Sequence, residues 1–307
     1  MHSLPSISGA VLHSIAKWHG LNIARIERLP STGIINAIYA LDNALILRVP
    51  RNDPVGISDT LTESVAAPVA FAAGVRTPRL VIFDESREIL DVPYTIYERV
   101  RGETLGAFQD PSGIHHAWTA LGRDLALLHT SVISCDDPQG RLDTPQRDDF
   151  RDKLEWFASR GIVTSSHARW IGRWLDVLAP AVFRHITPRF LHNDLQANNV
   201  MVATTSQGYL AMIDWGDAGW GDPALDLCAI PLRAIPSTMK GYREVRPFDG
   251  DDTLEARVLW DQIMNALKQL SCAQRPGTSR AGYLIELLRF VLEERDGRFR
   301  QWFLSSV

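Results

Sequence analysis

The sequence lacks the features that mark membrane-bound and secreted proteins. No apolar run reaches the roughly 18 residues that a transmembrane helix needs, and residues 1–20 contain no basic start followed by an apolar segment. We therefore expect neither a membrane span nor a signal peptide. The three cysteines, Cys135, Cys228 and Cys272, are far apart and form no Cys-x-x-Cys pair. Sparse, unpaired cysteines favour reduced thiols in the cytoplasm over a disulfide framework.

A strong excess of one charge is also missing. Lys and Arg total 32 and Asp and Glu total 36, for a formal net charge of -4, which argues against a general nucleic-acid binder. Residues 1–102 are electrically balanced, so the net charge lies in residues 103–307. That distribution favours a cationic substrate in the second part, and it suits an ordinary solvated helical surface equally well. Nothing in the sequence indicates an obligate protein partner.

Internal repeats and low-complexity tracts are absent too, and the first hundred residues are rich in strand-forming segments. Residues 37–50 predict a β-hairpin around a turn at Asp42 and Asn43. Residues 80–83 and 94–100 predict further strands, because β-branched and aromatic side chains dominate them.

One helix is expected among these strands, and helices dominate the rest of the chain. The Ala-rich stretch 62–73 predicts a helix that ends at Gly74, although Pro68 removes one helix hydrogen bond and weakens that prediction. After Gly102, apolar residues recur at helical spacing in four segments: 116–129, 170–178, 258–270 and 283–292. A second hairpin, 199–203 with 209–213, interrupts them. These patterns predict an α+β protein with a β-rich part, residues 1–102, and a mainly helical part, residues 103–307.

A chemical motif lies around this second hairpin. His192 and Asp194 are followed by Asn199, and Asp214 closes the second strand of the hairpin. This is the His-x-Asp-x-x-x-x-Asn spacing of kinase catalytic loops, followed by a metal-binding aspartate. The hairpin brings Asn199 and Asp214 together although they are distant in sequence.

Phosphoryl transfer explains why these residue types occur at this spacing. Catalysis consists mostly of positioning and charge neutralisation, so one carboxylate, Asp194, is expected to orient the acceptor hydroxyl and take its proton. Asn199 and Asp214 are expected to hold Mg²⁺, which prefers oxygen ligands and few protein side chains. The alternative is that Asp194 and Asp214 only cap turns. For His192, a structural role is favoured over proton transfer.

Several segments together resemble a known family. They are LHNDLQANNVMV, IDWGDAGWGDPALDL, LILRVPR with Glu63 downstream, YERVRGETL and LALLH, and they span most of residues 29–232. The pattern is similar to the aminoglycoside phosphotransferase family, which shares the protein-kinase-like fold with choline and macrolide kinases. The resemblance implies a bilobal fold, with an N-lobe of residues 1–102 and a C-lobe of residues 103–307, and the use of ATP and Mg²⁺.

The resemblance also implies a nucleotide site. Arg48 would lie where the phosphate-binding lysine usually lies, and Glu63 would be its ion-pair partner. The other implied roles are hinge contacts to adenine from Glu98 and Val100, a phosphate loop containing Gly33 and Asn36, and a buried carboxylate, Asp226, that braces the catalytic loop.

Some positions depart from the family pattern. Residues 30–36 contain no Gly-x-Gly-x-x-Gly loop, so phosphate cradling is implied by position only. Arg48 replaces the usual lysine, as in some relatives, and its guanidinium fork can bind phosphate in a bidentate manner. Asn193 stands where glycine is common, and Pro68 lies in the helix that is expected to present Glu63.

The expected function is therefore an ATP- and Mg²⁺-dependent O-phosphotransferase that acts on a small-molecule alcohol, either antibiotic-like or cationic. Kinases of choline or another amino-alcohol, use of GTP, and a non-catalytic nucleotide-binding module remain alternatives. A protein kinase is disfavoured, since only about ten residues separate Asp214 from Pro223 and leave little room for an activation segment.

Overall fold

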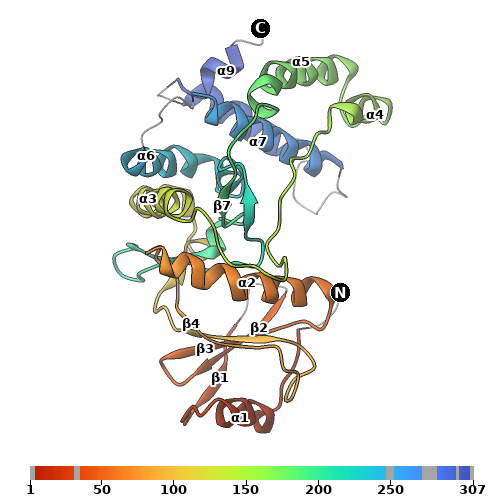
Figure 1. The fold of residues 1–307 in the computed structure, drawn as a ribbon. Coiled ribbons are helices and arrows are strands. Elements are labelled where there is room, and N and C mark those ends of the chain that lie inside the picture. The colour runs from red at the N-terminus through yellow and green to blue at the C-terminus, as the bar shows by residue number, and fades with distance from the viewer. Residues whose placement is uncertain (1–3, 31–34, 247–251, 272–281, 295–296, 305–307) are drawn as a thin grey trace.

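The computed structural model describes residues 4–30, 35–246, 252–271, 282–294 and 297–304. Figure 1 shows two parts, a sheet with its helices below and a mainly helical part above. The predicted combination of a β-rich beginning and a helical remainder is confirmed. In the described part of the chain, no helix is long and apolar enough to cross a membrane.

A five-stranded antiparallel sheet forms the first part. Its strands lie side by side in the order β1 (Ile26–Arg28), β2 (Asn36–Leu41), β3 (Leu45–Pro50), β5 (Tyr94–Glu98) and β4 (Leu80–Asp84). The predicted hairpin is β2 and β3, which pair Ile38 with Arg48. Its turn places Asp42 at φ 51°, a left-handed conformation that Asp tolerates better than most residues.

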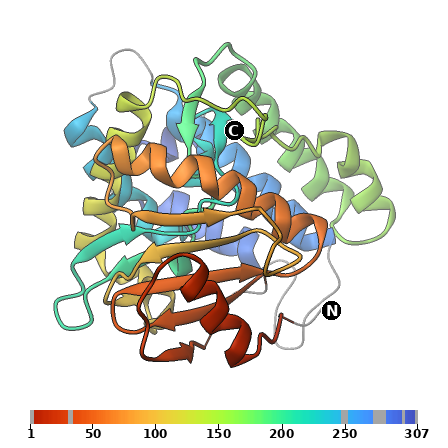
Figure 2. The same cartoon turned by 60° about the horizontal axis from the view of Figure 1, so that its bottom comes forward.

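Helices cover both faces of this sheet. Figure 2 shows α1 (Gly9–Trp18), which the sequence analysis did not predict, on the near side of the strands, and α2 (Pro54–Ala72) lies on the far side. Leu12 and Ile15 of α1 join a hydrophobic cluster with sheet residues such as Leu47. This smaller core holds the sheet to α1.

Helix α2 differs from the predicted helix 62–73. It begins at Pro54, where the Asp53 side chain accepts a hydrogen bond from Gly56 N at 2.8 Å, and proline is favourable at a first helical position. Pro68 lies inside the helix without ending it, so its predicted disruptive effect is wrong. Ala66, Ala67 and Ala70 of this segment are fully buried in the larger hydrophobic core, and this burial outweighs the hydrogen bond that proline removes.

The second part contains seven further α-helices among the described residues. They are α3 (His115–Ser131), α4 (Leu154–Ser159), α5 (Ser165–Val182), α6 (Ile235–Val245), α7 (Leu254–Ser271), α8 (Gly282–Glu293) and α9 (Arg300–Leu304). Helices α3, α5, α7 and α8 confirm the four predicted segments and extend each of them. Helices α4, α6 and α9 were not predicted.

Two small sheets lie between the main sheet and these helices. One contains the predicted second hairpin, β8 (Val200–Val202) and β9 (Tyr209–Met212), with β6 (Glu103–Thr104) alongside. The other pairs β7 (Arg189–Leu191) with β10 (Gly219–Gly221). Because β8 and β9 pair in antiparallel fashion, the residues before β8 and those after β9 lie at the same end of the hairpin.

Helices α3 and α6 approach closely because glycine lies at their crossing. A Cβ on Gly122 would meet the Thr238 carbonyl oxygen at 2.0 Å, and one on Gly241 would meet the Thr119 carbonyl oxygen at 1.8 Å. Only glycine permits backbones to approach to this distance.

We expect Gly241→Ala to destabilise the protein. Overpacking costs about 1–3 kcal/mol, more than the roughly 1 kcal/mol that alanine gains over glycine in a helix. Urea unfolding followed by circular dichroism measures the change. Gly9→Ala is the matched control, since no atom lies within 4 Å of its added Cβ. Equal unfolding midpoints for the two variants would contradict this account of the crossing.

Candidate active site

A buried arginine joins three separate elements at the centre of the molecule. Arg48 on β3 bonds through Nη1 to Oε1 of Glu63 on α2, and through Nη2 to Oδ1 of Asp214, two residues after β9, at 2.5 Å in each case. The Arg48 side chain is 12% exposed. Charge-assisted hydrogen bonds of this kind are stronger than neutral ones, so Arg48 fixes the sheet, α2 and the Asp214 loop relative to one another.

Burial and charge affect the two carboxylates differently. Burial raises the pKa of Glu63 to about 7, and the positive charge of Arg48 offsets only part of this effect. Burial also acts to raise the pKa of Asp214, but the charge and hydrogen bond of Arg48 outweigh it and hold that pKa below its ordinary value. Asp214 is therefore kept as an anion.

The loop after β7 is held in a strained shape by a buried carboxylate. Asp226, fully buried, accepts hydrogen bonds from the backbone N–H groups of His192 and Asn193 at 3.1 and 2.5 Å, and it bonds to His129 Nε2 at 2.9 Å. Asn193 has φ 66°, a conformation in which asparagine is enriched. This explains why Asn193 can stand where the family commonly has glycine, and it matches the bracing role implied for Asp226.

Asp194 and Asn199 face each other across this loop. Asn199 Nδ2 donates to Oδ2 of Asp194 at 2.8 Å and to its backbone oxygen at 2.9 Å, so Asn199 Oδ1 remains available to a cation. The backbone N–H of Ile213 donates to the Asn199 carbonyl oxygen at 2.9 Å, and His192 Nε2 donates to the Ile213 carbonyl oxygen at 3.0 Å. These bonds bring Asp214 beside the Asp194 loop and give His192 the predicted structural contacts.

The donor set fits a magnesium ion that is shared with phosphates. Asp214 and Asn199 supply one carboxylate and one amide oxygen, which are ligands that Mg²⁺ prefers, and phosphate and water oxygens usually complete its coordination. Among the described residues, no group of three or more His, Cys, Asp or Glu side chains is arranged to hold a metal. Two protein oxygens would leave the other coordination positions of such an ion to phosphate and water oxygens.

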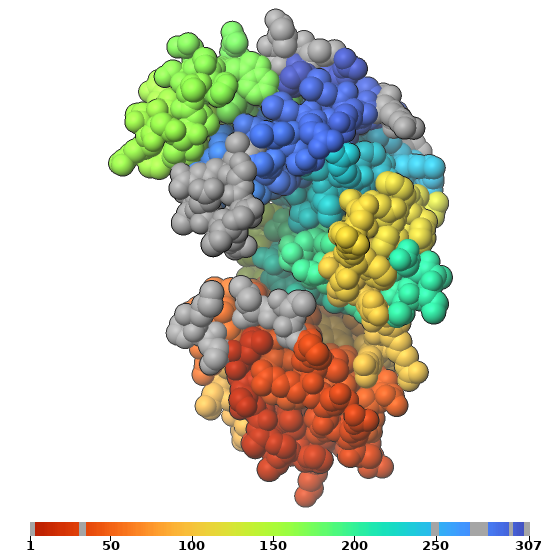
Figure 3. Space-filling model, turned by 180° about the vertical axis from the view of Figure 1, so that it is seen from behind, coloured from red at the N-terminus to blue at the C-terminus, as the bar shows by residue number. Residues whose placement is uncertain are grey.

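Of the remaining predicted nucleotide residues, Glu98, Val100 and Asn36 are among the described residues, and Val100 follows the end of β5 by two residues. Figure 3 shows a hollow between the red and orange first part and the rest of the molecule. Glu98 ends β5, and its N–H already donates to the Arg79 carbonyl oxygen at 2.9 Å, so this N–H is not the backbone group that it could offer to adenine. Asn36 is buried at the start of β2 rather than within a loop. Gly33 lies outside the described residues.

Comparison with known proteins places the chain in a family. The sequence profile of the phosphotransferase enzyme family matches residues 27–240. The chain belongs to this phosphotransferase family. The prediction of a phosphotransferase enzyme, like the resemblance on which it rested, is thereby confirmed.

Solved structures show the same fold. A GDP complex of wild-type aminoglycoside 2'-phosphotransferase-IIIa is 18% identical with a TM-score of 0.57, covering 92% of this chain and 97% of that one. A choline/ethanolamine kinase family protein from Mesorhizobium loti is 18% identical with a TM-score of 0.57, covering 92% of both chains. Spectinomycin phosphotransferase with ADP and spectinomycin is 13% identical with a TM-score of 0.57, covering 99% and 100%. The predicted bilobal, kinase-like fold of this phosphotransferase is confirmed.

Sequence analysis missed one carboxylate beside the site. Asp59 lies one helical turn before Glu63 on α2, and the position for a Cβ on Gly216 is only 2.7 Å from Asp59 Cβ. Partial burial, together with the charges of Asp217 and Asp214, raises the pKa of Asp59 to about 7. The four-residue spacing from Glu63 was the signal that could have identified it.

We expect Asp59→Asn to change how the stability of this phosphotransferase depends on pH in magnesium-free buffer. A raised native pKa gives stability below the unfolded pKa, near 4, that is lost as pH rises to about 7. Asparagine does not titrate, so the melting temperature of the variant relative to wild type should increase between pH 4.5 and pH 7.5. Thermal melts across this range measure it, and a constant difference would contradict the raised pKa.

Proposed function

We propose that this phosphotransferase transfers the γ-phosphate of ATP to a hydroxyl group of a small molecule, with Mg²⁺. The observation that supports it best is the double ion pair of Arg48 with Glu63 and Asp214, beside the hydrogen-bonded pair Asp194 and Asn199. The residues that we propose for phosphate binding, metal binding and proton transfer are thus connected, since the Ile213 N–H beside Asp214 donates to the Asn199 carbonyl oxygen. The same site would accept GTP if the hinge contacts allow it.

Each side chain has a defined part in the proposed reaction. Asp194 orients the acceptor hydroxyl and takes its proton as the oxygen forms a bond to the γ-phosphorus. The bond from that phosphorus to the β–γ bridging oxygen breaks, and ADP leaves. Arg48 holds the non-transferred phosphates, since its fork matches phosphate oxygens. A magnesium ion held by Asn199 and Asp214 would neutralise phosphate charge.

The charges around Asp194 favour a cationic acceptor. Loss of hydration and the negative charges of Asp194 and Asp214 raise the pKa of Asp217, and Asp143 adds to this effect. A cleft with several carboxylates attracts positively charged molecules. An antibiotic-like amine or another amino-alcohol such as choline meets this requirement. Phosphotransferases for both kinds of molecule share the fold, so the fold alone does not choose between them.

The alternatives have less support. A protein kinase needs a long activation segment, whereas here β10 (Gly219–Gly221) and the short 3-10 helix Leu225–Leu227 follow Asp214 closely. A non-catalytic module does not require a base and two metal ligands, and this chain retains the residues proposed for all three roles, Asp194, Asn199 and Asp214. We also infer a cytoplasmic location from the sparse cysteines, of which Cys135 and Cys228 are free thiols.

A nucleotide-consumption screen tests the proposed reaction. Purified protein with Mg·ATP or Mg·GTP is offered aminoglycosides, spectinomycin and amino-alcohols, and the phosphorus resonance of the product identifies a phosphate ester. We expect an ester on a hydroxyl group of at least one cationic compound. Nucleotide hydrolysis without an ester in every case would contradict the proposal.

We expect Asp194→Ala to lower turnover with the best acceptor by at least ~10²-fold, because the proton acceptor is lost. Nucleotide binding, measured by calorimetry with Mg·ATP, should stay within a few-fold of wild type, because Asp194 does not hold the metal. Gln196→Ala is the control, since it removes only a hydrogen bond to Asp194. Near-wild-type turnover of Asp194→Ala would rule out its role as the base.

A further inference from the structure

The linker between α3 and α4, residues 133–150, takes an indirect path through the molecule. Figure 1 shows it as the yellow-green segment that leaves α3, descends to α2 and returns upward to α4. Helices α3 and α4 both belong to the second part, and a direct connection between them would be shorter, since most loops in compact domains are short. The contacts along this path indicate what it does.

At its lowest point the linker holds α2 on both sides of Glu63. The Thr62 hydroxyl donates to the Arg141 carbonyl oxygen at 2.7 Å, and Arg141 Nη1 donates to the Ser64 hydroxyl at 3.0 Å. Arg141 Nη2 also pairs with Glu85, just after β4, at 2.7 Å. The Arg141 side chain is 13% exposed. Both neighbours of Glu63 are therefore bonded to one residue of the linker.

The next residues of the linker pair with the loop that follows Asp214. Asp143 N donates to the Ala218 carbonyl oxygen at 3.3 Å, and Trp220 N donates to the Asp143 carbonyl oxygen at 2.9 Å. A Cβ on Gly219 would lie 2.1 Å from that same carbonyl oxygen. Glycine at this position is what lets the linker run against β10.

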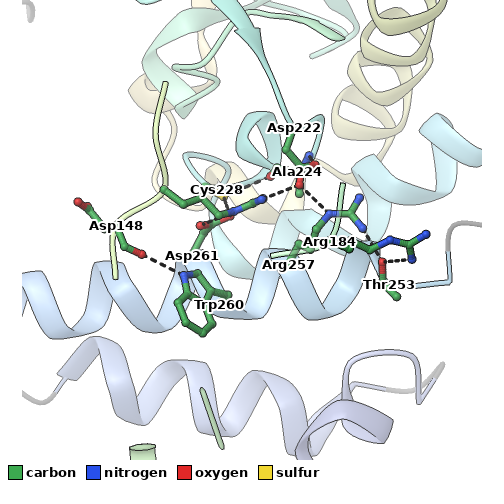
Figure 4. Close-up of polar contacts among 10 residues, drawn as sticks. Asp148, Arg184, Asp222, Ala224, Cys228, Thr253, Arg257, Trp260 and Asp261 are labelled. Carbon is green, nitrogen blue, oxygen red and sulfur yellow. Dashed lines mark hydrogen bonds and ion pairs between the residues drawn. The ribbon is translucent and has the colours of Figure 1, made fainter. Parts of the chain in front are cut away.

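A buried ion-pair network fixes the upper end of the linker. Arg147 pairs with Asp222 at 2.5 Å and with Asp261 at 3.0 Å, and Arg257, which is fully buried, pairs with Asp222 at 2.8 Å. Figure 4 shows Asp222, Asp261 and Arg257 together, with the Cys228 thiol also directed at Asp261. Two positive and two negative charges balance here. The linker is thus anchored to α7 (Leu254–Ser271) before it reaches α4.

From these contacts we infer that Arg141 is a positioning residue for phosphoryl transfer, acting through Glu63. The linker couples α2 to the loop after Asp214, and its Arg141 keeps Glu63 directed at Arg48. Arg48 in turn contacts Asp214. The inference rests on the proposed function for its kinetic consequence, but the tether of α2 to the linker stands on the contacts alone.

Arg141 is a better site for a test than Arg147. Removing one partner of a buried ion pair is strongly destabilising, and Arg147→Ala would remove a partner from two. Arg141 bonds to a hydroxyl and to a half-exposed carboxylate, so Arg141→Ala should fold. Arg123→Ala is the matched control, because it removes an arginine whose ion pair, to Glu244 of α6, lies at the surface.

The first experiment measures the tether without any catalysis. Hydrogen exchange followed by mass spectrometry is compared for wild type, Arg141→Ala and Arg123→Ala without nucleotide. We expect faster exchange in peptides that cover residues 57–66 of α2 in Arg141→Ala only. Unchanged protection of these peptides would overturn the role of the Arg141 side chain in holding α2, whatever the outcome of the activity measurements.

The second experiment measures the consequence for turnover. We expect Arg141→Ala to lower kcat/KM for Mg·ATP roughly 10- to 100-fold, the scale of a small misplacement of a catalytic group, with partial rescue by Arg141→Lys and little effect of Arg123→Ala. In a Glu63→Gln background, Arg141→Ala should cost at most about twofold more, because contacts that act through one residue are not additive. The same loss in both backgrounds would overturn the role through Glu63, and an inactive wild type would overturn the proposed function alone.

Discussion

The Arg48 guanidinium is the point on which the site depends. It lies on the central hairpin of the sheet and reaches a carboxylate on α2 and another beyond β9. Neither acid is near Arg48 in sequence, and both are fixed by it. If Arg48 paired with only one of these acids, the other carboxylate would lose its positively charged partner, which is costly for a buried group. The contacts of Arg48 that shape the site therefore also fix how the two parts of the protein are placed relative to one another.

That constraint is supported by packing as well as by charge. Helix α2 belongs to the larger core through Ala66, Ala67 and Ala70, although the sequence places it among the strands of the first part. Its C-terminal side leads to Arg76, which bonds to Asp124 on α3 at 2.9 Å. The linker 133–150 ties its middle through Arg141. Helix α2 is thus held to the second part at several points, which favours a site that is formed before nucleotide arrives.

Much of the fold and part of the site could be predicted from local patterns. The spacing of His192, Asp194 and Asn199 specified one loop, and helical periodicity located the main helices of the second part. The start of α2 was not predicted, although Asp53 as a cap and the proline after it are local signals of a helix start. Arg141 could not be recognised, since its partners Ser64 and Glu85 lie 77 and 56 residues away. Contacts over such distances follow from tertiary packing, which no local pattern encodes.

A crystal structure with Mg²⁺ and a non-hydrolysable ATP analogue is the decisive test of these site assignments. We expect a metal about 2.0–2.1 Å from Asn199 Oδ1 and from an Asp214 carboxylate oxygen, with Arg48 on the phosphates and the terminal phosphate facing Asp194. A metal held by other side chains, or a nucleotide bound away from Arg48, would contradict them.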